Sequence, residues 1–312
     1  MLVTRGGGAV SAAAPVAVTI GNFDGVHLGH QAMVARVVDA ARARGLMPAA
    51  LTFEPHPREL FSPASAPTRI TSFREKVELL GHHGVQRVHV RRFSRRFASL
   101  SPEAFVEQVL ARELRARWVL IGDDFRYGAK RAGDVAALVE AGHRHGFEVA
   151  FMPTVMLGGE RASSTAVREA LAAGDLERAR RLLGRTYSID GRVVHGDKLG
   201  RELGYATANV RMKHNRPPFT GIFAVRVHGL GDAARNGVAS LGVRPTVSDS
   251  GRHVLEVHLF DFAEEIYGRR LRVEFLAKIR DEAKYADLDT LKAQIARDCD
   301  AARDLLKQHA HA

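Results

Sequence analysis

The 312-residue chain contains a single cysteine, Cys299. One cysteine excludes an intramolecular disulfide framework and a cysteine-rich zinc site. Because Cys299 falls on an apolar stripe with helical spacing, we expect it to pack like a small hydrophobic residue and to have no redox role.

Long hydrophobic runs are also missing. The apolar segment 12–20 is too short to span a bilayer, and it continues into a loop of glycines and histidines instead of a signal-peptide cleavage site. We therefore expect a cytoplasmic protein with no membrane partner.

Aromatic residues make up only 7% of the chain, and 35 acidic residues face 46 lysines and arginines, which gives a net charge of +11. That charge suits nucleic-acid binding as well as an enzyme with polyanionic nucleotide substrates. The aromatic content is low for a base-stacking surface, and the arginine cluster at 91–96 is typical of a solvated face. We expect no nucleic-acid partner; an RNA-binding protein is the alternative, which a salt-dependent gel shift would reveal.

The composition that remains, 46% hydrophobic and 26% charged, indicates an ordinary globular protein, long enough for two domains. In the first half, apolar runs alternate with helical patterns. This alternation predicts a parallel sheet covered on both faces, with ligands bound beyond the carboxyl ends of the strands, in a domain spanning 14–184. The expected strands are 16–20, 46–53, 87–90, 118–121 and 147–152.

After Gly184 the pattern changes to β-rich runs separated by glycine and proline turns. These runs predict an antiparallel barrel or sandwich in a second domain spanning 185–312. An apolar stripe from Leu288 to Leu306 predicts a terminal helix that docks on the strands. The segment 1–14 carries no motif, and we expect it to be loose. The expected strands of this domain are 187–194, 222–227, 238–241, 254–262 and 271–276.

The first motif, GNFDGVHLGH at 21–30, joins a predicted strand to a predicted helix. Gly21 and Gly25 let the backbone approach an anion, and the amides of the first helical turn can bind phosphate oxygens. His27 and His30 lie three residues apart and therefore share one helix face. Two such histidines are more often surface residues, and a metal site lacks a third ligand with suitable spacing. Phe23 lies within the same candidate phosphate loop.

A second anion site is predicted at 161–168, RASSTAVR. The hydroxyls of Ser163, Ser164 and Thr165 can cap a helix, and Arg168, one turn later, can bind a phosphate. A serine-threonine run alone is most often only a cap. Together with the histidines it resembles the nucleotidyltransferase superfamily, in which AMP is transferred from ATP and charge develops on phosphate oxygens.

The second half has its own glycine-rich motif at 191–200. Gly196, Lys198 and Gly200 are compatible with close approach to phosphates, although such stretches in β domains are usually turns. Shortly after it, Thr207 and Asn209 offer hydroxyl and amide oxygens, which are ligands suited to Mg²⁺.

One carboxylate stands out in the strand predicted at 254–262. Glu256 alternates with Leu255 and Val257, so it projects from the face opposite the apolar side chains. It is either a general base for a hydroxyl nucleophile or a solvated strand residue, and the strand alone favours the second interpretation.

The motifs occur in a distinctive order along nearly the whole chain: GNFDGVHLGH, TFEPHP, IGDDFRYG, SSTAVR, GRVVHGDKLGRELGYATAN, GIFAV, GVRPT, LEVHLFDF and FLAKIRDE. This order resembles the bacterial bifunctional riboflavin kinase/FMN adenylyltransferase family, also called FAD synthetases. The resemblance implies an α/β Rossmann-like nucleotidyltransferase domain that adenylylates FMN to FAD. It also implies a C-terminal antiparallel β-barrel with a terminal helix that phosphorylates riboflavin to FMN, both reactions using ATP and Mg²⁺.

For the first domain, the resemblance places His27 and His30 on the ATP phosphates. Ser164, Thr165 and Arg168 would close over the leaving pyrophosphate. The pocket for flavin and nucleotide would be formed with the help of Phe53, Pro57, Asp124 and Phe125.

For the second domain, the resemblance makes Thr207 and Asn209 the Mg-ATP ligands and Glu256 the base for the riboflavin 5′-hydroxyl. The segment 280–282 would help to enclose the flavin. The sequence does not indicate an oligomeric state.

The chain departs from the family pattern at two positions. Ala206 stands where the kinase motif has proline, which leaves the loop less preorganised by about 1 kcal/mol or less. We expect a working but weaker kinase; the alternative is a monofunctional FMN adenylyltransferase with an impaired kinase domain. Asp124 replaces an asparagine of some relatives and is expected to affect ATP affinity. A flavin-binding module without turnover is a further alternative, which the retained His27, His30, Arg168 and Glu256 disfavour.

Overall fold

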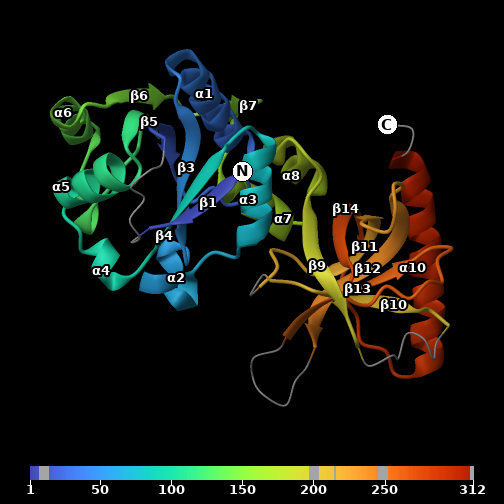
Figure 1. The fold of residues 1–312 in the computed structure, drawn as a ribbon. Coiled ribbons are helices and arrows are strands. Elements are labelled where there is room, and N and C mark those ends of the chain that lie inside the picture. The colour runs from blue at the N-terminus through green and yellow to red at the C-terminus, as the bar shows by residue number, and fades with distance from the viewer. Residues whose placement is uncertain (7–13, 197–203, 214–215, 245–251, 310–312) are drawn as a thin grey trace. The chain divides into compact units, whose positions relative to one another are not determined.

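A computed structural model describes residues 1–6, 14–196, 204–213, 216–244 and 252–309. The chain divides into two compact units (Figure 1). The first unit contains residues 1–67 and 73–164, and the second contains residues 68–72 and 165–312.

The first unit is built on a parallel six-stranded sheet with the strand order β1-β4-β3-β2-β5-β6 (Figure 1). The strands predicted from apolar runs are present, within one or two residues of the expected bounds at nearly every end. The central strand β2 is buried along its whole length, which explains why all of its residues except Thr19 are apolar. The bounds are β1 Leu2–Arg5, β2 Val16–Ile20, β3 Met47–Glu54, β4 Arg87–Arg92, β5 Ala116–Gly122 and β6 Glu148–Met152.

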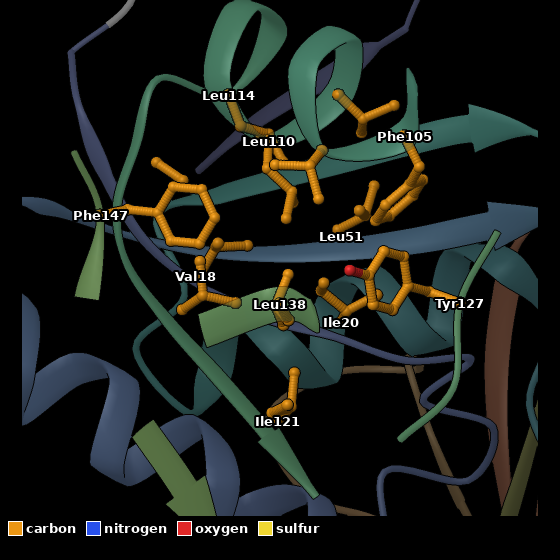
Figure 2. Close-up of a cluster of buried hydrophobic side chains, with 14 of the residues drawn as sticks. Val18, Ile20, Leu51, Phe105, Leu110, Leu114, Ile121, Tyr127, Leu138 and Phe147 are labelled. Atoms are coloured by element: carbon orange, nitrogen blue, oxygen red, sulfur yellow. The ribbon is translucent and has the colours of Figure 1, made fainter. Parts of the chain in front are cut away.

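Helices cover both faces of this sheet. On one face, Leu110 and Leu138 pack against Val18, Leu51 and Ile121 in a large apolar cluster (Figure 2). On the other face, two smaller clusters contain buried residues of α1 and α3. The bounds are α1 Leu28–Arg44, α2 Pro57–Phe61, η1 Pro63–Ser65, α3 Phe73–His82, α4 Arg95–Ala98, α5 Pro102–Phe105, η2 Val106–Glu113, η3 Ala129–Arg131 and α6 Val135–His145, with a small hairpin of β7 Met156–Leu157 and β8 Glu160–Arg161.

The expectation of a loose N-terminus was wrong for residues 2–5, because these form the edge strand β1 beside β4. The Leu2 amide donates to the Gln86 carbonyl at 2.7 Å, and the Thr4 hydroxyl lies 2.8 Å from His89 Nδ1. Leu2 and Val3 remain exposed, so β1 has no alternating apolar pattern that sequence inspection would detect. It is a strand because β4 offers an unpaired edge.

The second unit contains a closed antiparallel barrel with the strand order β10-β13-β12-β11-β14-β9, which decides between the two predicted architectures (Figure 1). Sequence inspection missed β10 as a strand, because Thr207 and Asn209 were interpreted only as candidate Mg²⁺ ligands. The strands are β9 Ser188–Val194, β10 Thr207–Arg211, β11 Gly221–His228, β12 Arg235–Arg244, β13 Arg252–Leu259 and β14 Arg270–Arg280; two helices, α7 Ser164–Ala172 and α8 Leu176–Leu183, precede them.

The terminal helix α10, Leu288–His309, docks on the barrel as its apolar stripe predicts. Cys299, Ala302 and Leu306 are buried against Ala224 and Phe260. The packing role of Cys299 is thereby confirmed, and burial raises the pKa of its thiol to about 11. Within the described part of the chain, no helix is both long and apolar enough to cross a bilayer.

Candidate active sites

The turn between β2 and α1 holds an unusual backbone. Phe23, Gly25 and Val26 all have positive φ angles, of 50°, 81° and 42°. For a β-branched residue such as Val26 this region is strained, at a typical cost of about 1–3 kcal/mol. The strain is maintained because the side chains of Phe23 and Val26 are completely buried. Such strained turns occur preferentially at functional sites.

This turn places two imidazole rings together. His27 is the N-cap residue of α1 and His30 lies in its first turn. The two rings stack with their centroids 3.7 Å apart, and Phe23 contacts His30 edge-on at 5.1 Å. A Cβ atom at Gly29 would lie 3.1 Å from the His27 ring and from the Ala162 carbonyl oxygen, so a side chain there would press on the stack. The predicted juxtaposition of the histidines is present.

The electrostatics of the turn favour an anion. The pKa of His30 lies well below 6.5, because burial disfavours the charged ring and because His27 and the buried Lys76 are nearby positive groups. At neutral pH His30 is therefore an uncharged hydrogen-bonding group. The first turn of α1 contains no acidic residue, so the positive end of the helix dipole is not neutralised there.

The histidines line a cavity of about 220 Å³, here called the histidine cavity. The side chains of Arg161 and Asp124 form an ion pair of 3.0 Å, and both line the cavity. Its lining includes the predicted residues Gly21, Phe23, His27, His30, Asp124, Phe125 and Ser163.

The remaining residues of the second predicted anion site surround the start of α7. The Ser164 hydroxyl donates to the Asp24 carbonyl at 2.8 Å, which holds this serine against the glycine turn that contains Gly25, within the first unit. Thr165 and Arg168 belong to the second compact unit. There the Arg168 guanidinium donates from Nε to the Thr68 carbonyl at 2.6 Å.

A second cavity of the first unit, about 980 Å³, is here called the aromatic cavity. All four residues predicted for the flavin and nucleotide pocket, Phe53, Pro57, Asp124 and Phe125, line it. Phe53 meets Phe93 edge-on at 5.8 Å. Flat apolar walls of this kind suit a planar ring system.

Sequence inspection missed several side chains of the aromatic cavity. Tyr127 stacks on Phe125 at 5.7 Å, and burial together with the nearby Glu103 and Asp134 raises the pKa of its hydroxyl to about 12. Arg95, from the cluster interpreted as a solvated face, also lines the cavity. The GDDFRYG motif was the available signal for Tyr127. Further lining residues outside the prediction are Phe61, Phe93, Phe97, Arg126, Lys130 and Arg131.

The histidine and aromatic cavities adjoin. Gly21, Asp124 and Phe125 line both, at the carboxyl ends of β2 and β5. A ligand in one cavity can therefore reach a ligand in the other across these residues. This is the arrangement that transfer between two bound molecules needs.

The barrel contains a cavity of about 690 Å³, here called the barrel cavity, lined by Thr207, Asn209 and Glu256. Asn209 on β10 pairs in register with Glu256 on β13. Leu255 and Val257, the neighbours of Glu256, are fully buried, so the predicted alternation of faces is present.

Gly196 lies beside this set. A Cβ atom there would sit 2.2 Å from Nδ2 of Asn209, so the close approach of the Asn209 side chain requires glycine. Lys198 and Gly200, which were predicted to bind phosphate, lie outside the described residues.

An ion pair that involves a buried carboxylate and lines the barrel cavity was not predicted. The Arg280 guanidinium donates to both carboxylate oxygens of Asp298, at 2.8 and 2.6 Å, and Gln294 adds a third hydrogen bond at 2.9 Å. Arg280 and Asp298 both line the cavity, and hydrogen bonding to Asp298 raises the pKa of Arg280. Asp298 lies beside Cys299 on the helical stripe, but nothing in the sequence pairs it with Arg280.

Two family models match the chain. The model described as FAD synthetase covers residues 10–166, and the model described as riboflavin kinase covers residues 183–306. The bifunctional riboflavin kinase/FMN adenylyltransferase of Escherichia coli K12 is 48% identical over 286 residues, which are 92% of this chain and 91% of that protein. The protein of the same name from Pseudomonas fluorescens is 47% identical, over 94% of each chain. The chain belongs to the bifunctional riboflavin kinase/FMN adenylyltransferase family.

A solved structure supports the fold of this family member. A Streptococcus pneumoniae protein, described as a macrolide-efflux protein, superposes with a TM-score of 0.82 and 28% identity over 97% of this chain and 99% of that one. The words macrolide-efflux protein describe the Streptococcus pneumoniae protein alone. What the two chains share is the fold, along nearly their whole length.

The family membership confirms the predicted enzyme class and fold class. The FMN adenylyltransferase domain is the α/β unit with the histidine and aromatic cavities, and the riboflavin kinase domain is the barrel with its terminal helix. The chain is thus a transferase of FAD biosynthesis that contains both a riboflavin kinase domain and an FMN adenylyltransferase domain. The domain bounds 14–184 and 185–312, like the roles of individual residues, stay predictions.

Proposed function

We propose that the histidine cavity binds the phosphates of ATP and that the aromatic cavity binds FMN. The observation that carries this proposal is that the two cavities share Gly21, Asp124 and Phe125. A phosphate of FMN at this junction faces the α-phosphorus of ATP. Attack forms the new P–O bond of FAD and releases pyrophosphate.

The residues of the adenylyltransferase site act by positioning and by stabilising charge. His27, His30 and the amides at the start of α1 donate hydrogen bonds to oxygens that gain negative charge in the transition state. Ser163, which lines the histidine cavity, and the neighbouring Ser164 hold the departing pyrophosphate. The attacking phosphate oxygen is already anionic, so this step needs no general base.

In the kinase domain, we propose that riboflavin binds in the barrel cavity with its 5′-hydroxyl at Glu256. The carboxylate accepts the hydroxyl proton while the oxygen attacks the γ-phosphorus of ATP, which gives FMN and ADP. The position of Glu256 in the cavity, in register with Asn209, supports this role over that of a solvated strand residue.

Thr207 and Asn209 fit a Mg²⁺ ion bound together with ATP. Among the described residues there is no group of three histidine, cysteine or acidic side chains that could hold a metal by itself. Mg²⁺ commonly takes only one or two protein oxygens and completes its shell with water and phosphates. When bound, the ion neutralises charge on the transferred phosphoryl group.

The arrangement also bears on the alternative of an impaired kinase. Ala206 stands in place of the family's proline directly before β10. Thr207, Asn209 and Glu256 nevertheless line one cavity. We therefore propose that both reactions take place. The cytoplasm remains the expected location.

Product chromatography tests the two assignments together. The wild-type protein with ATP and Mg²⁺ is expected to yield FAD from riboflavin and from FMN. Glu256→Gln is expected to yield FAD from FMN only, and His27→Asn is expected to accumulate FMN from riboflavin without FAD. Glu264→Gln, an exposed carboxylate of the same domain, is the matched control and is expected to behave like the wild type. FAD production from riboflavin by Glu256→Gln at the wild-type rate would refute the role of that carboxylate.

A further inference from the structure

One side chain of the barrel cavity contacts the position where the chain departs from the family motif. The Nδ1 atom of His258 lies 2.9 Å from the carbonyl oxygen of Ala206. His258 also pairs in register with Thr207, the next residue along the chain. The imidazole thus reaches back across the start of β10, at the peptide group that leads into Thr207.

The ring is held by more than this hydrogen bond. Tyr205 meets it edge-on at 5.4 Å and Phe260 at 5.9 Å. His258 lies two residues beyond Glu256 on β13, so both side chains share one strand face and both line the barrel cavity. The histidine therefore has one defined position between β13 and the loop.

The carbonyl oxygen of Ala206 determines which ring nitrogen of His258 carries a proton. A carbonyl oxygen only accepts hydrogen bonds, so Nδ1 of His258 carries the proton and donates. Both the corresponding neutral tautomer and the charged imidazolium provide that donor. The contact therefore persists whether or not the ring is charged, and Nδ1 is not available to take a proton from a substrate.

The geometry points to His258 as a positioning residue of the kinase, which holds the carbonyl of Ala206 so that Thr207 and Asn209 are preorganised for Mg-ATP. Proline at position 206 would fix its own φ and would restrict the backbone of the preceding residue. Alanine does neither. The hydrogen bond from β13 supplies a restraint that the alanine lacks. This inference rests on the proposed role of Thr207 and Asn209.

The experiment compares steady-state riboflavin phosphorylation by the full-length protein in four forms: wild type, His258→Phe, Ala206→Pro and the double variant. Phenylalanine keeps a ring for Tyr205 and Phe260 to pack on but removes the donor. We expect His258→Phe to raise KM for Mg-ATP roughly three- to tenfold, as befits one hydrogen bond, with kcat changed less than twofold. Proline at 206 is expected to restore most of this loss in the double variant and to have little effect alone, because proline keeps the carbonyl oxygen.

Two controls keep the outcome specific. His228→Phe is the same substitution at a histidine outside the barrel cavity, whose Nε2 atom lies 3.1 Å from the Glu274 carboxylate. It is expected to leave the KM for Mg-ATP unchanged. FAD formation from FMN by each variant reports whether the rest of the protein is intact. His258→Gln, which retains a side-chain donor, is expected to fall between the wild type and His258→Phe.

Three results would overturn the inference. The first is an unchanged KM for Mg-ATP in His258→Phe, and the second is a KM in the double variant as high as that of His258→Phe. The third is a large loss of kcat in His258→Phe together with the loss of one limb of the pH profile, which would make His258 a catalytic residue. The proposed site itself fails separately: in that case Thr207→Ala and Asn209→Ala would leave the Mg²⁺ and ATP dependence of the wild-type kinase unaltered.

Discussion

The rings of His27 and His30 lie parallel within 26° at a centroid separation of 3.7 Å, over a turn in which a Cβ atom at Gly29 would lie 3.1 Å from the His27 ring. Three local features therefore produce the stack: the strained turn, the start of α1 and the absence of a Cβ atom at Gly29. Small changes at the glycine are therefore expected to act on the histidines without removing either of them.

Gly29→Ala tests this relationship. Its Cβ would press on the His27 ring and on the Ala162 carbonyl at 3.1 Å, and the ring is the group that can move. We expect FAD formation from FMN to fall about tenfold, since small misplacements of catalytic groups are costly. Riboflavin phosphorylation by the same protein is the internal control and is expected to stay unchanged. Full adenylyltransferase activity would show that the observed stacking is not needed for catalysis.

The lowered pKa of His30 predicts how the stability of the adenylyltransferase domain depends on pH. In the unfolded chain the histidine takes up a proton near pH 6.5, whereas in the folded domain burial, His27 and Lys76 delay protonation to a much lower pH. Between these two values the unfolded state binds more protons. Folding stability is therefore complete above pH 6.5 and falls as the pH drops below it, by up to about 1.4 kcal/mol per pH unit.

Denaturant unfolding between pH 7.5 and 5.5 measures this dependence. The single tryptophan, Trp118 on the buried strand β5, reports on this domain by its fluorescence. His30→Asn is expected to flatten the dependence on pH, and His143→Asn, at an exposed position of α6, is expected to keep it. Equal slopes for His30→Asn and the wild type would contradict the assignment.

Asp124 is expected to tune ATP affinity and not stability. Its ion pair with Arg161 is largely exposed, at 69% and 54% of the two side chains, and such pairs contribute little to folding. Removing the carboxylate removes a negative charge from a cavity proposed to hold a polyanion. We predict that Asp124→Asn lowers KM for ATP in FAD formation about fivefold, which corresponds to about 1 kcal/mol.

The matched control for this change is Glu148→Gln. Glu148 also forms an exposed ion pair, with Arg44 at 2.9 Å, but it does not line the histidine cavity. It should leave KM for ATP unaltered. An increase of KM in Asp124→Asn would instead show that the carboxylate assists binding, for example by orienting Arg161.

The ion pair between Arg280 and the buried Asp298 is expected to matter for both folding and flavin binding. Asp298→Ala leaves a largely buried guanidinium without its carboxylate, and breaking such a pair typically costs about 3 kcal/mol. Because both residues line the barrel cavity, we also expect KM for riboflavin to rise. Asp300→Ala, on the exposed side of the same helix, is the control. Far-UV circular dichroism during denaturation and riboflavin kinetics provide the two measurements.

Much of the fold was predictable because local patterns carry it. The run at 16–20 is completely buried and is apolar except for Thr19, because burying polar side chains in a covered parallel sheet costs free energy. The stripe that contains Cys299 and Leu306 predicted a docked helix for the same reason. By contrast, β1 is a strand only because β4 lies beside it, and exposed Leu2 and Val3 give no periodic signal.

The sequence by itself determined which groups are candidates for the chemistry: two histidines three residues apart, a serine-threonine run and a carboxylate opposite an apolar strand face. Their spacing is local, so short-range geometry suffices to predict that His27 and His30 meet. Only the tertiary structure decided the pairings between distant segments. That Asp298 binds Arg280, and that His258 holds the carbonyl of Ala206, depends on helix docking and barrel register, which arise from the packing of the whole domain.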